Sequence, residues 1–126
     1  HPFRIPDEYV DVIPEGELPI HKCVTYTDKA LRSFFEMAKG SEWFRNTLFV
    51  ITADHSNKTN NPEYKTASGF FEVPIIFYSP DGDAPFSAAI DSCTIAQQID
   101  IMPTLLDYLG YDKPYVAFGK SLISQI

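Results

Sequence analysis

The sequence predicts an α/β fold, because two short apolar segments rich in β-branched residues lie between two amphipathic helical patterns. The apolar segments, 47–52 and 73–78, have the composition of strands that are buried on both faces, as in a parallel sheet. The helical patterns cover residues 25–39 and 100–109. Because these strands are too few for a free-standing sheet, we expect them to be a few mostly parallel strands of a larger sheet that is packed by helices.

Length and composition indicate one folded domain. The chain has 126 residues, of which 44% are hydrophobic, so it can bury a core and general disorder is excluded. We therefore treat residues 1–126 as a single domain. Ten basic residues against 17 acidic ones give a net charge of −7, which argues against nucleic acid as a partner.

The first helix is predicted over residues 25–39. Residues 1–20 contain four prolines and read as an extended segment, although their apolar side chains should lie against another element. Thr25 and Asp28 have the spacing of a capping box, and Gly40 suits the end of the helix. The expected buried face of this helix consists of Leu31, Phe34, Phe35 and Ala38.

The second half of the chain reads as strand, long polar loop, strand and helix. Pro74 is tolerable near the start of the segment 73–78. In the last helix, Asp100 is a candidate N-cap, Pro103 lies in the first turn, and Gly110 follows the end. Residues 118–122 are expected to form a turn followed by a short strand or a hook.

Asp54 and His55 are the main candidates for chemistry, because they follow the first predicted strand directly. In open α/β sheets, ligands collect beyond the carboxyl ends of strands. A carboxylate oxygen and a neutral imidazole nitrogen together suit Mn²⁺, Zn²⁺ or another divalent cation. The pattern therefore predicts part of a metal site, although two ligands do not complete one.

A structural interpretation of the same pair stays open, in which Asp54 caps a turn and His55 is an ordinary polar residue. On local grounds, His1 has no site role, and His21 is a surface residue. Cys23 has no activating base in the adjacent sequence and reads as an incidental thiol. Residues 81–83 resemble only a fragment of a calcium loop and are expected to form a solvated turn.

Several segments together resemble the sulfatase and alkaline-phosphatase superfamily. Residues 42–55 resemble its strand and metal-ligand segment, residues 73–80 its next strand, and residues 98–106 its late helix. The segments 26–28 and 118–122 also fit. The nearest branch is the lipoteichoic-acid synthase and phosphoglycerol transferase group. The resemblance implies a partial alkaline-phosphatase-like sandwich.

The resemblance also implies roles for three residues. The Asp-His pair of the family binds the catalytic divalent metal, so Asp54 and His55 are expected metal ligands, with Mn²⁺ favoured over Zn²⁺, Mg²⁺ or Ca²⁺. The family has a His-Pro-Phe or His-Pro-Tyr segment whose His contacts the anionic head group of the substrate. His1, in His1-Pro2-Phe3, matches that segment and becomes an expected substrate-binding residue.

The family's nucleophile and a further carboxylate ligand belong to an N-terminal half that has no counterpart in this sequence. We therefore expect the chain to be the C-terminal portion of a larger catalytic domain, inactive alone and completed by the remainder of that domain. Its expected function is part of a metal-dependent phosphoglycerol transferase-like enzyme, or one that cleaves phosphodiesters or sulfate esters. A metal-activated hydroxyl of the parent would attack phosphorus or sulfur.

Three alternatives remain. An arylsulfatase typically has Gly after its Asp-His pair and Arg before the second strand, where this chain has Ser56 and Glu72. A non-catalytic binding module would keep the fold without tight metal binding. The resemblance implies action in the periplasm or at the cell surface and is compatible with a membrane anchor in the parent. The third alternative, a stand-alone structural domain, requires strand edges that the chain covers itself, whereas exposed strand edges would favour an oligomer and a fragment of a larger domain.

Overall fold

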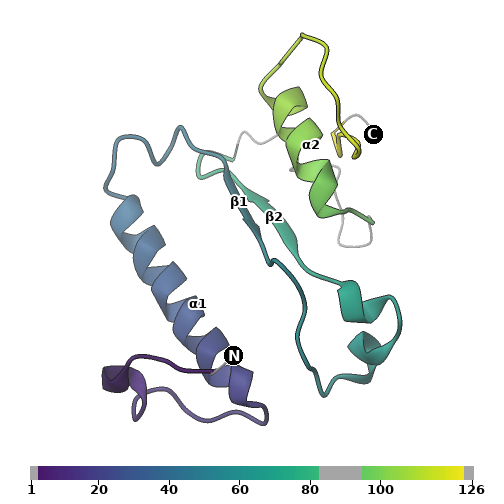
Figure 1. Cartoon of the computed structure of the whole chain (residues 1–126). Coiled ribbons are helices and arrows are strands. Elements are labelled where there is room, and N and C mark those ends of the chain that lie inside the picture. The colour runs from purple at the N-terminus through teal and green to yellow at the C-terminus, as the bar shows by residue number, and fades with distance from the viewer. Residues whose placement is uncertain (1–2, 83–94, 124–126) are drawn as a thin grey trace. The chain divides into compact units, whose positions relative to one another are not determined.

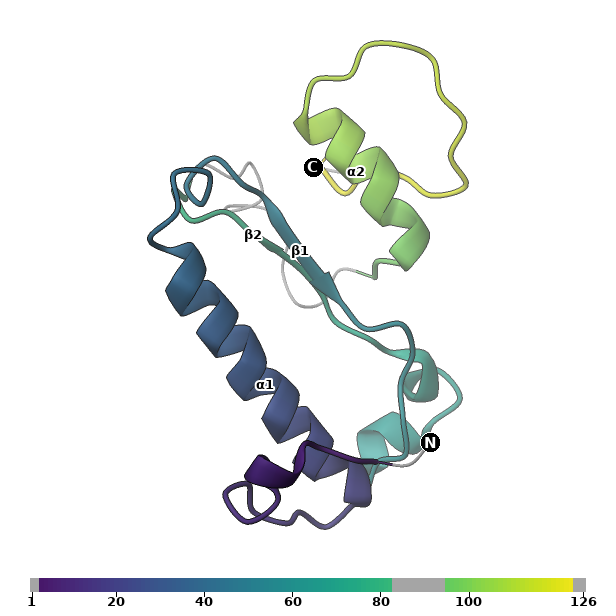
Figure 2. The same cartoon turned by 60° about the vertical axis from the view of Figure 1, so that its left-hand side comes forward.

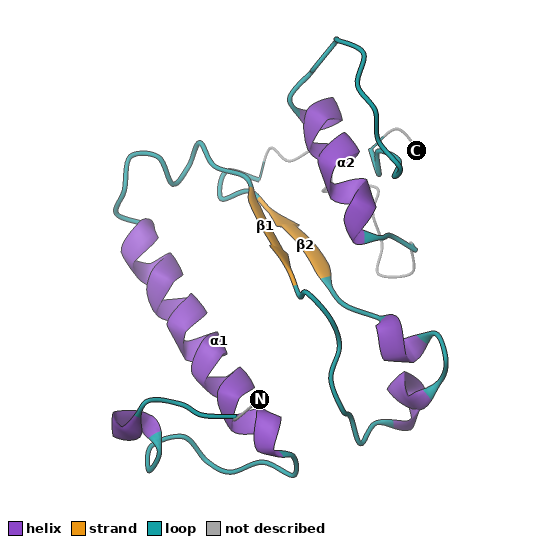
Figure 3. Ribbon diagram, in the orientation of Figure 1, coloured by secondary structure: helices purple, strands orange, loops and turns teal. Residues whose placement is uncertain are grey.

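The α/β class is confirmed by a computed structural model, which describes residues 3–82 and 95–123. The described residues contain two α-helices, α1 and α2, and one two-stranded sheet of β1 and β2 (Figures 1 and 3). The chain divides into two compact units, residues 1–44 and residues 45–126. None of the described helices is long and apolar enough to cross a membrane.

In the first unit, α1 spans Pro19–Ala38 and therefore begins six residues before the predicted start. Pro19 occupies the first turn, where its missing N–H costs no hydrogen bond, and Leu18 before it is extended. Thr25 is consequently inside the helix and does not cap it. Its hydroxyl donates to the His21 carbonyl one turn earlier, at 3.0 Å.

The proline-rich segment packs against the first turns of α1, as its apolar content predicts. Ile13 is only 2% exposed. The rings of Tyr9 and Tyr26 meet edge to face, with their centroids 5.0 Å apart. The thiol of Cys23 faces the Arg4 carbonyl at 3.9 Å, so this cysteine has a local structural contact. Cys93 lies outside the described residues.

In the second unit, β1 (Phe49–Thr52) and β2 (Ile75–Tyr78) pair antiparallel, with Phe49 opposite Tyr78 and Thr52 opposite Ile75. The expected parallel direction is wrong for this pair. An apolar run carries no information about direction, and a parallel return needs a crossover, usually through an α-helix. The expected burial on both faces is also wrong for β2, because Ile76 and Tyr78 are 48% and 39% exposed. Residues 53–74 contain only two short 3-10 helices, at Pro62–Lys65 and Gly69–Phe71, and lead back to the same end of the sheet (Figure 2).

The last helix, α2, spans Ile101–Tyr108 and continues a 3-10 turn at Gln98–Asp100. It ends as predicted, because Gly110 adopts a φ of 66°, which favours glycine. Asp100 does not cap the helix with its side chain. Its two carboxylate oxygens instead accept hydrogen bonds from the Gln97 N–H and the Lys120 N–H, each at 2.8 Å.

The C-terminal segment forms the predicted hook, which folds back onto α2 without a strand in its described part. The buried hydroxyl of Thr104 donates to the Asp100 carbonyl at 2.5 Å and accepts from the Leu122 N–H at 3.0 Å. Gly119 lies so close that a Cβ atom there would be 2.6 Å from a carboxylate oxygen of Asp100 and would collide with the Ile99 carbonyl. Asp100 and Thr104 therefore join two segments of the unit.

Candidate metal centre

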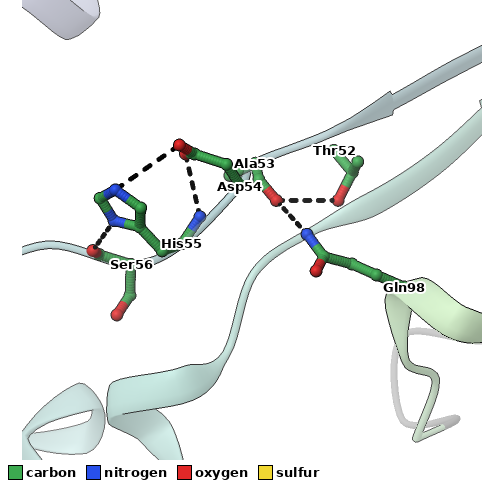
Figure 4. A network of polar contacts seen from close by, with 6 residues as sticks. All are labelled: Thr52, Ala53, Asp54, His55, Ser56 and Gln98. Carbon is green, nitrogen blue, oxygen red and sulfur yellow. Dashed lines mark hydrogen bonds and ion pairs between the residues drawn. The ribbon is translucent and has the colours of Figure 1, made fainter.

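The end of β1 presents Asp54 and His55 to solvent. The strand's last ladder pair is Thr52 with Ile75, so the chain leaves the sheet at Ala53. The side chains of Asp54 and His55 are 88% and 62% exposed, and the Oδ2 atom of Asp54 lies 3.5 Å from the Nε2 atom of His55. The two side chains thus turn toward one another and are open to a ligand (Figure 4).

Local hydrogen bonds orient both side chains. The Oδ1 atom of Asp54 accepts from the His55 N–H at 2.9 Å, so Oδ2 is the oxygen that faces the imidazole. The Nδ1 atom of His55 lies 2.7 Å from the Ser56 carbonyl oxygen. Because a carbonyl can only accept, Nδ1 carries the proton and donates. In the neutral ring, this leaves the lone pair of Nε2 directed toward Asp54.

This pair of atoms fits two neighbouring ligand positions of a divalent metal. Two metal–donor bonds of about 2.1 Å hold their donors about 3.0 Å apart at a right angle and about 3.4 Å apart at a tetrahedral angle. The observed separation of 3.5 Å is close to the upper value. A carboxylate oxygen and a neutral imidazole nitrogen facing one another offer two lone pairs that a cation can share. Fixing the histidine tautomer through its other nitrogen is typical of metal-binding histidines.

No third ligand completes this centre within residues 3–82 and 95–123, where no group of three or more His, Cys, Asp or Glu side chains could hold a metal ion. His1, the predicted substrate-binding residue, lies outside the described residues. Asp81, in the weak calcium-loop pattern, faces Arg45 at 3.8 Å, and Asp83 is also outside the described residues. His21 is exposed, as predicted for a surface residue.

A cleft of about 1090 Å³ lies beside His55 and was not foreseen from the sequence. His55 and Ser56 line it, together with the ring of Tyr64 and the adjacent rings of Phe70 and Phe71. The Ser56 hydroxyl donates to the Phe70 carbonyl and so ties the two sides of the polar loop together. In the sequence, the adjacent aromatic residues Phe70 and Phe71 after the polar loop were the one pattern that could have indicated this cleft.

Gln98 is a second residue that sequence reasoning missed. Its side-chain amide donates to the carbonyl oxygen of Ala53 at 2.5 Å, directly before the Asp54–His55 pair (Figure 4). The two residues are 45 positions apart, so no local pattern could have connected them. The contact links the turn before α2 to the end of β1.

An α/β unit with an acid–imidazole pair at the end of a strand defines a candidate metal-dependent protein. The family model described as Sulfatase matches residues 20–111, and the chain belongs to the sulfatase family. The resemblance to the sulfatase and alkaline-phosphatase superfamily is thereby confirmed. Members of this superfamily are generally hydrolases, transferases or mutases, and they are generally dependent on divalent metals.

Three curated relatives illustrate the range of the superfamily. Lipoteichoic acid synthase 1 of Bacillus subtilis is 28% identical over 114 residues, which cover 79% of this chain and 17% of the relative. A 2,3-bisphosphoglycerate-independent phosphoglycerate mutase of Haloquadratum walsbyi is 35% identical over 79 residues, which cover 59% of this chain and 15% of the relative. The multifunctional alkaline phosphatase superfamily protein PehA of Trinickia caryophylli is 25% identical over 104 residues, which cover 79% of this chain and 20% of the relative.

The chain thus spans between 15% and 20% of the length of these relatives. No solved structure gives a significant match.

Proposed function

We propose that this chain forms part of the catalytic domain of a divalent-metal-dependent enzyme that cleaves or transfers a phosphate or sulfate ester. The observation that carries the proposal is the exposed pair of donor atoms on Asp54 and His55, 3.5 Å apart and each oriented by a local hydrogen bond. The short span relative to the curated relatives supports a larger domain that supplies the remaining ligands and the nucleophile.

Asp54 and His55 would hold the metal through Oδ2 and Nε2. A bound divalent metal neutralises charge on the transferred group and lowers the pKa of an attacking hydroxyl. Mn²⁺ suits the mixed oxygen and nitrogen donors, although Zn²⁺ shares this preference. The Ser56 carbonyl keeps Nδ1 protonated, so that Nε2 remains the ligand atom. His1 is proposed as a contact to the anionic group, on the family resemblance alone.

Two sequence positions support a phosphoglycerol transferase-like activity over an arylsulfatase-like one, because Ser56 and Glu72 stand where an arylsulfatase typically has Gly and Arg. The lining of the cleft includes Glu72 and no lysine or arginine from the described residues. An anionic ester would be repelled by Glu72, so the anion belongs at the metal and an uncharged part of the substrate belongs in the cleft. An extracytoplasmic site of action is proposed on the resemblance to the lipoteichoic-acid synthase group.

The test is metal content and turnover of the full-length protein that contains this chain. We expect the wild type to retain a divalent metal after gel filtration and to turn over a phosphoglycerol or phosphate ester in preference to a sulfate ester. The chain of 126 residues alone should be inactive. Asp54→Asn should lose both metal and turnover.

Two outcomes would contradict the proposal, and a third would reverse the expected substrate preference. Turnover by the 126-residue chain alone that Asp54→Ala abolishes would refute the claim that the chain needs the rest of the catalytic domain. A preference for aryl sulfate would identify a sulfatase activity. A full-length protein that folds and binds no metal would be a binding module that kept only the fold.

A further inference from the structure

We propose that Gln98 is a positioning residue for the metal ligands, because it holds the peptide group that precedes Asp54. The inference rests on the proposed function of Asp54 and His55 as ligands. It concerns a different element, since Gln98 belongs to the turn that leads into α2. The inference is based on the hydrogen bond that the Gln98 side-chain amide donates to the Ala53 carbonyl oxygen.

The Ala53 carbonyl needs partners from outside the sheet. The β1–β2 ladder ends with Thr52 opposite Ile75, so Ala53 has already left the paired region. Its oxygen accepts from the Thr52 hydroxyl at 3.3 Å and from the Gln98 amide at 2.5 Å. The Thr52 contact joins neighbouring residues, whereas the Gln98 contact fixes the carbonyl to a distant part of the unit. Gln98 therefore supplies the long-range constraint on this peptide group.

Holding this oxygen also fixes the direction in which Asp54 leaves the strand. The peptide group from Ala53 to Asp54 is planar, so the position of the Ala53 oxygen determines the position of the Asp54 nitrogen and Cα atom. The Asp54 carboxylate is then set by the His55 N–H, and the imidazole by the Ser56 carbonyl. Among the described residues, the hydrogen bonds made by the two side chains themselves each span a single residue, and the Ser56 hydroxyl holds the chain after His55 to the Phe70 carbonyl. Gln98 thus connects a locally ordered but highly exposed pair to the body of the unit.

Gln98 is itself held in place by the buried Asp100. The carboxylate of Asp100 accepts from the N–H groups of Gln97 and Lys120, and the residue is only 8% exposed. The Asp100 N–H in turn donates to the Gln97 carbonyl at 2.9 Å. The turn that carries Gln98 is therefore closed at both ends and fastened to the C-terminal hook. This network gives the Gln98 side chain a fixed base from which to reach Ala53.

The test compares Gln98→Met with Lys65→Met in the full 126-residue chain. Gln98→Met preserves the length of the side chain and removes the amide donor. Lys65→Met places the same side chain at an exposed position of the same unit, outside the turn in which the Gln97 side chain caps the Asp100 N–H. We expect Gln98→Met to weaken Mn²⁺ binding roughly tenfold, the lower end for residues that orient metal ligands, with Lys65→Met no weaker than the wild type. Affinities come from Mn²⁺ titrations followed by the broadening of the amide resonances of Asp54 and His55.

A purely structural role would lower the melting temperature and leave the Mn²⁺ affinity unchanged. The amide resonances of Asp54 and His55 separate the two roles without any metal, because the ¹³C resonance of the Ala53 carbonyl reports only the loss of the hydrogen bond. They should move in Gln98→Met and stay in place in Lys65→Met. Should Gln98→Met fail to fold, Gln98→Asn serves instead, because it keeps an amide that is one methylene too short to reach Ala53.

The outcomes distinguish this inference from the proposed function. A wild-type chain that binds Mn²⁺ at Asp54 and His55, with equal affinity in Gln98→Met, would overturn the positioning role alone. A full-length protein that binds no Mn²⁺ would count against the proposed function, whereas a 126-residue chain that binds none would show that two ligands do not suffice. The amide resonances of Asp54 and His55 would then decide the inference: a shift confined to the Gln98 variants supports it, and unchanged resonances refute it.

Discussion

Two aspartates of the same unit, Asp54 and Asp100, show how one residue type serves two different purposes. Asp100 is 8% exposed, and both of its carboxylate oxygens accept hydrogen bonds from backbone N–H groups. The Asp54 side chain is 88% exposed, and one of its oxygens faces the imidazole of His55 and no other side chain among residues 3–82 and 95–123. The hydrogen-bonding capacity of Asp100 is used within the fold, whereas Asp54 keeps an oxygen available for a ligand.

The comparison also separates stability from function. Breaking the hydrogen bonds of a buried carboxylate lowers the free energy of unfolding much more than breaking those of an exposed carboxylate. Changes at Asp100 should therefore affect folding first, and changes at Asp54 should affect metal binding with little effect on folding.

Asp54→Asn should reduce turnover of the full-length protein by at least about 100-fold, because removal of a direct ligand should exceed the loss from residues that only orient ligands. The melting temperature should change little, since the side chain is 88% exposed. Steady-state kinetics and thermal melting followed by circular dichroism measure the two effects. A large loss of stability with turnover preserved would give Asp54 the role assigned to Asp100.

Asp100→Ala should show the reverse pattern. We expect a loss of about 2–4 kcal/mol in the free energy of unfolding, because two hydrogen bonds to a carboxylate disappear and two N–H groups lose their acceptor. Urea denaturation measures the free energy, and hydrogen exchange should show reduced protection of the Lys120 amide in particular. A loss below about 0.5 kcal/mol, the range of ordinary surface changes, would refute the structural role of Asp100.

Gly119→Ala tests how closely the hook approaches Asp100. The added Cβ atom would lie 2.6 Å from an Asp100 oxygen and collide with the Ile99 carbonyl, so we expect a loss of about 1–3 kcal/mol by overpacking. Gly40→Ala is the matched control, because its Cβ would be 3.6 Å from the nearest atom, the Met37 carbonyl oxygen. Equal stabilities of the two variants in urea denaturation would show that the hook is not held against Asp100.

Asp81→Asn should have the smallest effect, within about 0.5 kcal/mol of the wild type. Asp81 pairs with Arg45 at 3.8 Å, and the two side chains are 45% and 83% exposed. It is an exposed aspartate without an adjacent imidazole, and so it controls for exposure alone. If Asp81→Asn weakened Mn²⁺ binding as much as Asp54→Asn, surface charge and not the Asp54–His55 pair would account for the binding.

The sequence predicted those features that depend on local patterns. The strands and α2 were located correctly because their apolar composition and the glycine at position 110 are local signals. The start of α1 was wrong because Pro19 begins the helix before the capping pattern at Thr25. The strand direction was wrong because an apolar run carries no information about direction.

The candidate site was predictable only in part, for the same reason. The adjacency of Asp54 and His55 is visible in the sequence, and the family resemblance added their expected role. The hydrogen bond from Nδ1 to the Ser56 carbonyl depends on how the chain turns after the strand. Gln98 and the two acceptor roles of Asp100 depend on contacts between residues far apart in the sequence. Such contacts leave no local pattern.

The central claim is that Oδ2 of Asp54 and Nε2 of His55 bind one metal ion together. The most direct test is a long-range ¹H–¹⁵N spectrum of the His55 ring during a Zn²⁺ titration, with Zn²⁺ as a diamagnetic substitute for Mn²⁺. We predict a neutral ring protonated at Nδ1, with Zn²⁺ shifting Nε2 in the wild type and much less in Asp54→Asn. A proton on Nε2, metal binding through Nδ1, or an identical response in Asp54→Asn would contradict the claim.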